Sequence, residues 1–149
     1  MGEAKAETMI DADLKEVWDV YFDDARWASW VDGFARVESS DGYPEHGGTL
    51  KWQSTPAGRG LVTEKVIAHE PRTVHRVSFD DPESEGELET TFEIQGDRVR
   101  VAQTMSYKIK HPGFFGPATD IFFVRRQVVG SLERSLARLK HETEEPEVG

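Results

Sequence analysis

Apolar residues recur along this chain with two different periods. In the middle they occupy every second position, whereas near the C-terminus they recur every three or four residues. The second spacing predicts one long helix from Ala118 to Glu142, with no internal proline. Five apolar side chains of this helix fall within an arc of about 80°, at about 100° per residue: Ile121, Val128, Leu132, Leu136 and Leu139. We expect this stripe to lie against an apolar sheet.

Segments of alternating polarity predict that sheet. Glycine, proline and aspartate separate seven such segments, as in short turns between strands: residues 4–10, 34–39, 49–54, 61–70, 73–79, 87–94 and 98–110. Two short helices, at about 14–22 and 24–31, are expected after the first strand, and Asp11 or Asp13 should cap the first of them. Strands joined by short turns pair antiparallel, so the predicted fold class is α+β.

The alternation also indicates which side chains face the helix. On the last strand, Gln103, Met105 and Tyr107 share one side with three further apolar residues, and Phe92 of the preceding strand turns inward as well. A buried amide or phenol without a partner costs about 1–3 kcal/mol. Gln103 and Tyr107 therefore either bond to neighbouring groups or orient a bound ligand.

Three further aromatic side chains and one histidine are candidates for the interior. His75 and Phe79 share the inward face of their strand, where a histidine is either a hydrogen-bonded core residue or a catalytic group. Trp30 and Trp52 each combine a large apolar ring with one N–H donor. They either fill the core or line the mouth of a pocket, together with the segment Phe114-Phe115-Gly116.

One cation interrupts the apolar stripe of the C-terminal helix. Arg125 projects from the same arc as Ile121 and Leu132. Its guanidinium can reach water near the start of the helix, pair with Glu64, or bind a carboxylate or another oxyanion of a ligand, a role that suits its planar array of donors. Arg59, between two glycines, is a second candidate for that role at the rim of a cavity.

Composition narrows the classes of partner. The formal net charge of −10 argues against nucleic acid and against anionic membrane surfaces. The chain has no cysteine, which is compatible with a reducing compartment, and no apolar run approaches the ~20 residues of a membrane span. We expect a cytoplasmic monomer or homodimer without membrane insertion. The chain should form one domain over residues 1–149, with a core at about 4–143 and a frayed acidic tail at 144–149.

Motifs for nucleophilic or metal chemistry are absent from the sequence. There is no G-x-S-x-G, no Gly-rich phosphate loop, and no histidine pair at the spacing of metal ligands. We therefore expect no cofactor and no metal site.

Four local features occur together in the order of the predicted elements. They are the run Ile10-Asp11-Ala12-Asp13-Leu14-Lys15-Glu16-Val17-Trp18, the pair Trp27 and Trp30, the turn Asp41-Gly42, and the run Gly48-Thr49-Leu50-Lys51-Trp52. In this combination the chain resembles the polyketide cyclase/dehydrase-type branch of the START-like, Bet v 1-like superfamily (SRPBCC). The resemblance implies a helix-grip fold, in which a curved antiparallel sheet wraps around the C-terminal helix and encloses a hydrophobic cavity. The superfamily includes carriers of lipids and other apolar ligands, cyclases and co-chaperone domains, so the fold alone does not assign an activity.

These observations together predict a protein that binds a small hydrophobic or amphipathic molecule, lipid-like or polyketide-like, in the cavity. The expected ligand-binding residues are Arg125, Tyr107, Gln103, His75, Trp52, Trp30, Phe79, Phe92, Met105 and Ile121. An alternative is an enzyme of the cyclase or dehydratase type, since positioning and one general acid or base can suffice; its candidates are Tyr107, Gln103, His75 and Arg125. A third possibility is a co-chaperone-like interaction module that docks through the acidic strand around Glu85 to Glu93.

Overall fold

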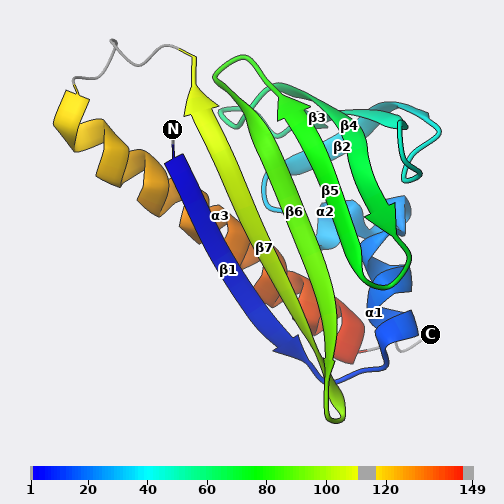
Figure 1. Ribbon diagram of the computed structural model, residues 1–149. Coiled ribbons are helices and arrows are strands. Elements are labelled where there is room, and N and C mark those ends of the chain that lie inside the picture. Colours follow the sequence, from blue (N-terminus) through cyan, green and yellow to red (C-terminus); the bar gives the residue numbers. More distant parts are fainter. Residues whose placement is uncertain (1, 111–116, 146–149) are drawn as a thin grey trace.

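The computed structural model describes residues 2–110 and 117–145. Within these ranges, seven strands form one antiparallel sheet in the order β1-β7-β6-β5-β4-β3-β2 (Figure 1). The strands are β1 (Gly2–Ile10), β2 (Phe34–Asp41), β3 (Thr49–Ser54), β4 (Leu61–Glu70), β5 (Val74–Asp80), β6 (Ser84–Gln95) and β7 (Arg98–Ile109). The chain therefore runs as a meander from β2 to β7, and β1 closes the sheet at the side of β7. The predicted α+β helix-grip fold is confirmed.

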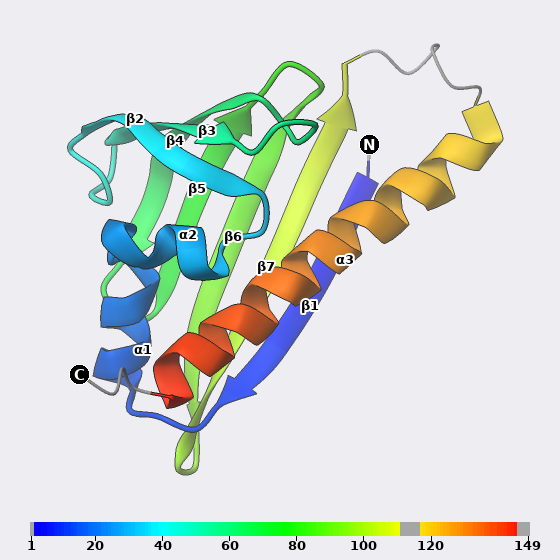
Figure 2. The same ribbon diagram turned by 180° about the vertical axis from the view of Figure 1, so that it is seen from behind.

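All helices lie on one face of the sheet (Figure 2). They are α1 (Leu14–Tyr21), the short 3-10 helix η1 (Asp24–Arg26), α2 (Trp27–Trp30) and α3 (Pro117–Glu144). Asp13 is the N-cap residue of α1, as expected, but its side chain forms no capping hydrogen bond. The core lies between the helices and the concave face of the sheet.

The long helix α3 lies alongside β1, and the C-terminal end of α3 is anchored to the rest of the domain (Figure 2). Leu132, Leu136 and Leu139 are at most 5% exposed, as the apolar stripe predicts. The carboxylate of Glu144 accepts a hydrogen bond from the backbone N–H of Asp11 at 2.7 Å. Burial and anchoring together fix the second half of α3 on the sheet.

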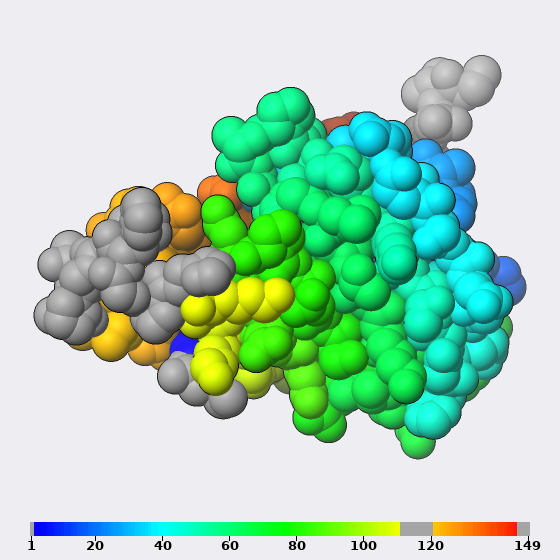
Figure 3. Space-filling model, turned by 90° about the horizontal axis from the view of Figure 1, so that it is seen from above, coloured from blue at the N-terminus to red at the C-terminus, as the bar shows by residue number. Residues whose placement is uncertain are grey.

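The first turns of α3 depart from the expectation. Ile121, predicted to pack against the sheet, is 65% exposed, and Arg125 is exposed as well. The reason is geometric, because the start of α3 extends beyond the sheet and stands at the periphery of the molecule (Figures 2 and 3). Periodicity correctly predicted the helical face but could not tell how far along the helix the sheet continues.

A carboxylate joins the end of α2 to the middle of α3. Asp32 accepts hydrogen bonds from Ser131 Oγ at 2.8 Å, from two nitrogens of Arg134 at 3.1 and 3.2 Å, and from Arg138 at 3.2 Å. Its own backbone N–H donates to Ser135 Oγ at 2.8 Å. Although burial opposes ionisation of Asp32, the bonds from Arg134 and Ser131 outweigh it and lower its pKa.

The acidic strand β6 carries its glutamates on the outer face of the sheet. Arg76 pairs with Glu87, and Arg100 lies 3.7 Å from Glu93. Opposite charges on neighbouring strands are ordinary stabilisers of a sheet. This outer face therefore shows the features of a solvated surface.

Candidate functional site

The sheet register aligns inward-facing residues of neighbouring strands into rows. The first row contains Leu50, Glu64, Phe79, Gly86, Tyr107 and Gly2. The second contains Val66, Val77, Leu88, Met105 and Ala4, and the third contains His69, His75, Thr90, Gln103 and Ala6. The concave face is thus mostly apolar, with a few polar groups at fixed positions, which is the usual character of a small-molecule site.

Tyr107 fills the space above a glycine of the first row. A Cβ atom added to Gly2 would lie 2.3 Å from the Tyr107 ring, so the ring occupies the volume that a side chain on β1 would take. Tyr107 is 6% exposed, and burial raises its pKa, while the charge of Arg125 opposes the shift. The start of α3 therefore lies close enough for Arg125 to influence this end of the concave face.

A buried hydrogen-bonded triad occupies the third row. Tyr21 of α1 bonds to the Thr90 hydroxyl at 2.8 Å, and the Gln103 amide nitrogen donates to both hydroxyl oxygens at 3.3 Å. Burial raises the pKa of Tyr21 to about 12, so its hydroxyl stays protonated. The Gln103 carbonyl oxygen is buried and has no hydrogen-bond partner within residues 2–110 and 117–145.

A second unpaired polar atom lies beside this triad. The ring of Trp30 packs 5.0 Å from the ring of Tyr21, and no acceptor in the described part of the chain reaches the buried Trp30 indole nitrogen. By contrast, the indole of Trp27 donates to the Tyr21 carbonyl at 2.8 Å. Buried polar atoms are nearly always satisfied in folded proteins. One free donor and one free acceptor next to Tyr21 therefore mark this region as suited to a ligand.

Two histidines and a tyrosine form a hydrogen-bonded chain beside the triad. His69 Nδ1 lies 3.0 Å from His75 Nδ1, and His75 Nε2 lies 3.2 Å from the Tyr43 hydroxyl. Burial, aided by the neighbouring His69, lowers the pKa of His75 to about 3, so His75 is neutral near pH 7. Burial also raises the pKa of Tyr43. The chain connects two partly buried side chains, His69 and Tyr43, through the buried imidazole of His75.

The matching family model is described as "Polyketide cyclase / dehydrase and lipid transport" and covers residues 1–144. This chain belongs to that family. No curated protein matches the sequence significantly.

Solved structures agree with the fold of this cyclase/dehydrase-family member at low sequence identity. The Zhui aromatase/cyclase of Streptomyces sp. R1128 superposes with a TM-score of 0.76 at 16% identity, over 95% of this chain and 93% of that one. Protein CV1439 of Chromobacterium violaceum gives 0.73 at 12%, over 98% and 100%. Truncated norcoclaurine synthase of Thalictrum flavum gives 0.71 at 14%, over 97% and 94%. These likenesses establish the shared fold.

Most of the residues predicted for the site of this cyclase/dehydrase-family chain come together. Eight of them are at most 8% exposed and lie on the concave face or against it: Tyr107, Gln103, His75, Trp52, Trp30, Phe79, Phe92 and Met105. Arg125 and Ile121 stand apart at the exposed start of α3. The segment Phe114-Phe115-Gly116, predicted at the mouth, lies outside the described residues.

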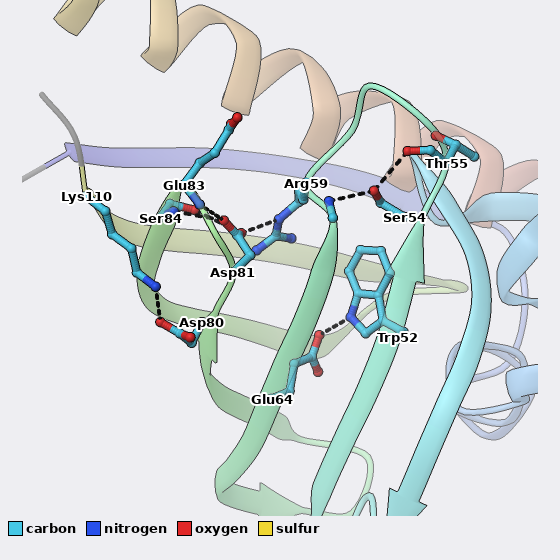
Figure 4. A network of polar contacts seen from close by, with 11 residues as sticks. Trp52, Ser54, Thr55, Arg59, Glu64, Asp80, Asp81, Glu83, Ser84 and Lys110 are labelled. Carbon is cyan, nitrogen blue, oxygen red and sulfur yellow. Dashed lines mark hydrogen bonds and ion pairs between the residues drawn. The ribbon is translucent and has the colours of Figure 1, made fainter. Parts of the chain in front are cut away.

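The partly buried carboxyl group of Glu64 was predicted only as a possible partner of Arg125 and not as a residue of the site. Glu64 accepts a hydrogen bond from the Trp52 indole at 2.9 Å (Figure 4). Burial raises the pKa of Glu64, although this bond and the charge of Arg59 act in the opposite direction. The signal was present in the sequence, because Glu64 shares the alternation of Val62 and Val66. Ile67, on the opposite parity, made the inward face of β4 ambiguous.

The cation at the rim of this face is Arg59. Its guanidinium carbon lies 4.8 Å from the centre of the Phe79 ring and 5.6 Å from that of the Trp52 ring. Its Nε donates to Asp81 at 2.9 Å (Figure 4). Arg59, and not Arg125, is therefore the arginine that contacts the rings of Trp52 and Phe79, which we call the aromatic wall.

Two pockets on the described surface lie elsewhere. One of about 470 Å³ lies between α1 and the end of α3 and is lined largely by charged side chains, among them Asp13, Asp19 and Glu142. The other, of about 350 Å³, lies beside the loop 54–60. Neither is lined by the inward-facing rows. None of the helices in the described ranges combines the length and the apolar character needed to cross a bilayer.

Proposed function

We propose that this protein binds a small hydrophobic or amphipathic molecule between the concave face of the sheet and α3. The observation that carries the proposal is a pair of buried atoms that find no hydrogen-bond partner among the described residues, the Gln103 carbonyl oxygen and the Trp30 indole N–H. Each costs about 1–3 kcal/mol while it lacks a partner. A ligand that hydrogen-bonds to either atom recovers this free energy on binding.

The surroundings of these atoms suit an apolar ligand. Aromatic rings enclose Tyr21 on several sides, with Trp30 at 5.0 Å, Phe92 at 5.3 Å and Phe22 at 4.8 Å between ring centres. Towards the start of α3 the apolar side chains are only partly buried: Leu88, Ile109, Val124 and Val128. A ligand lying over this partly buried surface would remove apolar area from water, which favours binding by roughly 25 cal/mol per Å².

The proposed contacts are the eight buried residues of the predicted set. Arg125 is a further proposed contact, at the part of the ligand that lies near Tyr107, since its charge already influences Tyr107. Ile121, on the same exposed turns of α3, would then cover the ligand from the helix side.

The direct test is native mass spectrometry of the protein as purified, followed by titration with an apolar fluorescent dye. We expect a bound small molecule, or stoichiometric dye binding that a Trp30→Phe variant weakens. Trp27→Phe is the matched control, because the Trp27 indole N–H is already bonded to the Tyr21 carbonyl. Dye binding that neither substitution changes would place any ligand outside the concave face.

A cyclase or dehydratase activity is the second candidate, and the chain His69–His75–Tyr43 favours it. Such reactions need a proton to be taken from or given to a carbonyl compound. Tyr43 lies at one end of the chain, next to the buried His75, and Glu64 is a carboxyl group whose pKa burial raises. A Tyr43→Phe variant should abolish turnover of a poly-β-ketone substrate. Unchanged turnover in that variant and in alanine variants of Tyr107, Gln103, His75 and Arg125 would dismiss the activity.

A further inference from the structure

Arg59 is held in place by one of its five N–H donors. Its Nε donates to Asp81 Oδ2 at 2.9 Å. Asp81 is only 2% exposed and also accepts the backbone N–H groups of Glu83 and Ser84 and the hydroxyl of Ser84. Among the described residues, the terminal amino groups of Arg59 have no hydrogen-bond partner. The guanidinium is thus fixed over the aromatic wall with donors to spare (Figure 4).

Glu64 presents the complementary group on the same wall. Its Oε2 accepts the Trp52 indole N–H at 2.9 Å, and no donor from the described residues reaches its Oε1. Glu64 stands in the first row of the sheet, directly beside Phe79 on the neighbouring strand. Trp52 therefore touches both polar groups, bonding to Glu64 and lying beneath Arg59.

Arg59 and Glu64 lie near each other without forming an ion pair. Both contact Trp52, and Arg59 lies over the ring of Phe79, which pairs with Glu64 across β4 and β5. Burial raises the pKa of Glu64, and the charge of Arg59 acts in the opposite direction. Within the described ranges Arg59 forms an ion pair with Asp81 and none with Glu64. Among these residues, Arg59 therefore offers unused donors, and Glu64 an unused acceptor, next to the same Trp52 ring.

We propose that Arg59 and Glu64 together hold the polar end of the ligand, and that this end is an uncharged group with both an acceptor and a donor, such as a hydroxyl or a primary amide. This inference rests on the proposed function and specifies the ligand class. A carboxylate on the ligand would pair with Arg59 but would be repelled by the carboxylate oxygen of Glu64. An ammonium group would pair with Glu64 but would be repelled by the cation of Arg59. A hydroxyl accepts from Arg59 and donates to Glu64 at the same time.

Four naphthalene derivatives substituted at the same ring position test the inference at pH 7: methylnaphthalene, naphthol, naphthoate and naphthylmethylamine. Calorimetric or fluorescence titration gives the dissociation constant of each. We expect naphthol to bind about tenfold more tightly than methylnaphthalene, as expected for hydrogen bonds to charged groups. Both ions should bind more weakly than naphthol.

Two substitutions of Glu64 then assign the preference to this residue. Glu64→Leu should bring naphthol to the affinity of methylnaphthalene and leave methylnaphthalene unchanged within about twofold. Glu64→Gln keeps an acceptor and removes the charge. This variant should keep the affinity for naphthol and increase the affinity for naphthoate. Glu89→Leu is the control, because Glu89 lies on β6, two strands away from β4, on the outer face of the sheet. Melting temperatures verify that all variants are folded.

The outcomes distinguish this inference from the proposed function. If no probe binds, methylnaphthalene included, the proposed function fails and the inference with it. If all four bind with equal affinity, or if Glu64→Leu has no effect on naphthol, the inference is wrong and the proposed function stands. A preference for naphthoate that Arg125→Ala abolishes would also overturn it, in favour of recognition of an acidic end by Arg125.

Discussion

Substitution of Gln103 by leucine should separate the stability of the protein from its ability to bind a ligand. The change removes an unpaired buried carbonyl oxygen, which costs about 1–3 kcal/mol. It also removes two hydrogen bonds from the amide nitrogen, each 3.3 Å long and thus at the weak end of the range of about 0.5–1.5 kcal/mol. The stronger bond between Tyr21 and Thr90, at 2.8 Å, remains. We expect Gln103→Leu to stabilise the ligand-free protein by about 1 kcal/mol.

Urea denaturation and thermal melting measure this effect. For a chain of this size, about 1 kcal/mol corresponds to an increase in melting temperature of about 2–4 °C. The same variant should bind the ligand, or an apolar dye that replaces it, about tenfold more weakly. Thr90→Val is the matched comparison, because it leaves the Tyr21 hydroxyl with only the long bond to Gln103, and it should destabilise the protein.

The reasoning is refuted if Gln103→Leu destabilises the protein by about 1 kcal/mol or more and leaves ligand affinity unchanged. Gln103 would then be an ordinary structural member of the buried triad. The unpaired atom would have no bearing on function.

Three further predictions concern pH and packing. Burial lowers the pKa of His75 from 6.5 to about 3, so the unfolded chain binds the extra proton first. The free energy of unfolding should therefore decrease as the pH is lowered from about 6.5 to about 3, by up to about 1.4 kcal/mol per pH unit. A His75→Gln variant should show a flatter dependence of this free energy on pH over the same range. The pKa of Asp32 is lowered, so its stabilising effect is present at neutral pH and lost as the pH falls below about 4. Asp32→Asn should cost about 1 kcal/mol at pH 7, a modest figure because its partner Arg134 is half exposed, and the difference from the natural protein should vanish in acid. In chemical denaturation, Leu136→Ala should cost about 2–5 kcal/mol, whereas Ile121→Ala should cost less than about 1 kcal/mol because its side chain is already exposed; equal costs would contradict the position of α3.

Much of the fold could be predicted because its strands and helices are marked by patterns of neighbouring residues. Strands β3 and β4 begin and end at the predicted residues, since glycine, proline and alternating polarity mark both boundaries. The helices after β1 and the C-terminal helix were also predicted within a few residues. Each of these signals lies within a short window of the chain.

The site was predicted less completely, because it depends on contacts between distant segments. Alternation correctly placed Gln103 and His75 on the inward face, but it could not show that Gln103 meets Tyr21 or that His75 meets Tyr43. Arg125 was predicted as a ligand contact because it interrupts an apolar stripe. It is exposed because the sheet does not extend as far as the start of α3. Arg59 was a second candidate because two glycines flank it, but its contact with Trp52 and Phe79 depends on the fold of its loop, which the sequence does not show.

The central claim is that a small molecule occupies the concave face beside Trp30 and Trp52. The most direct test is a nitrogen-15 NMR titration with naphthol that follows the indole N–H signals of the four tryptophans. The account predicts the largest shifts at Trp30, whose N–H gains an acceptor, and at Trp52, whose bond to Glu64 is altered, with smaller shifts at Trp18 and Trp27. Saturable binding that leaves the Trp30 and Trp52 signals in place would contradict it.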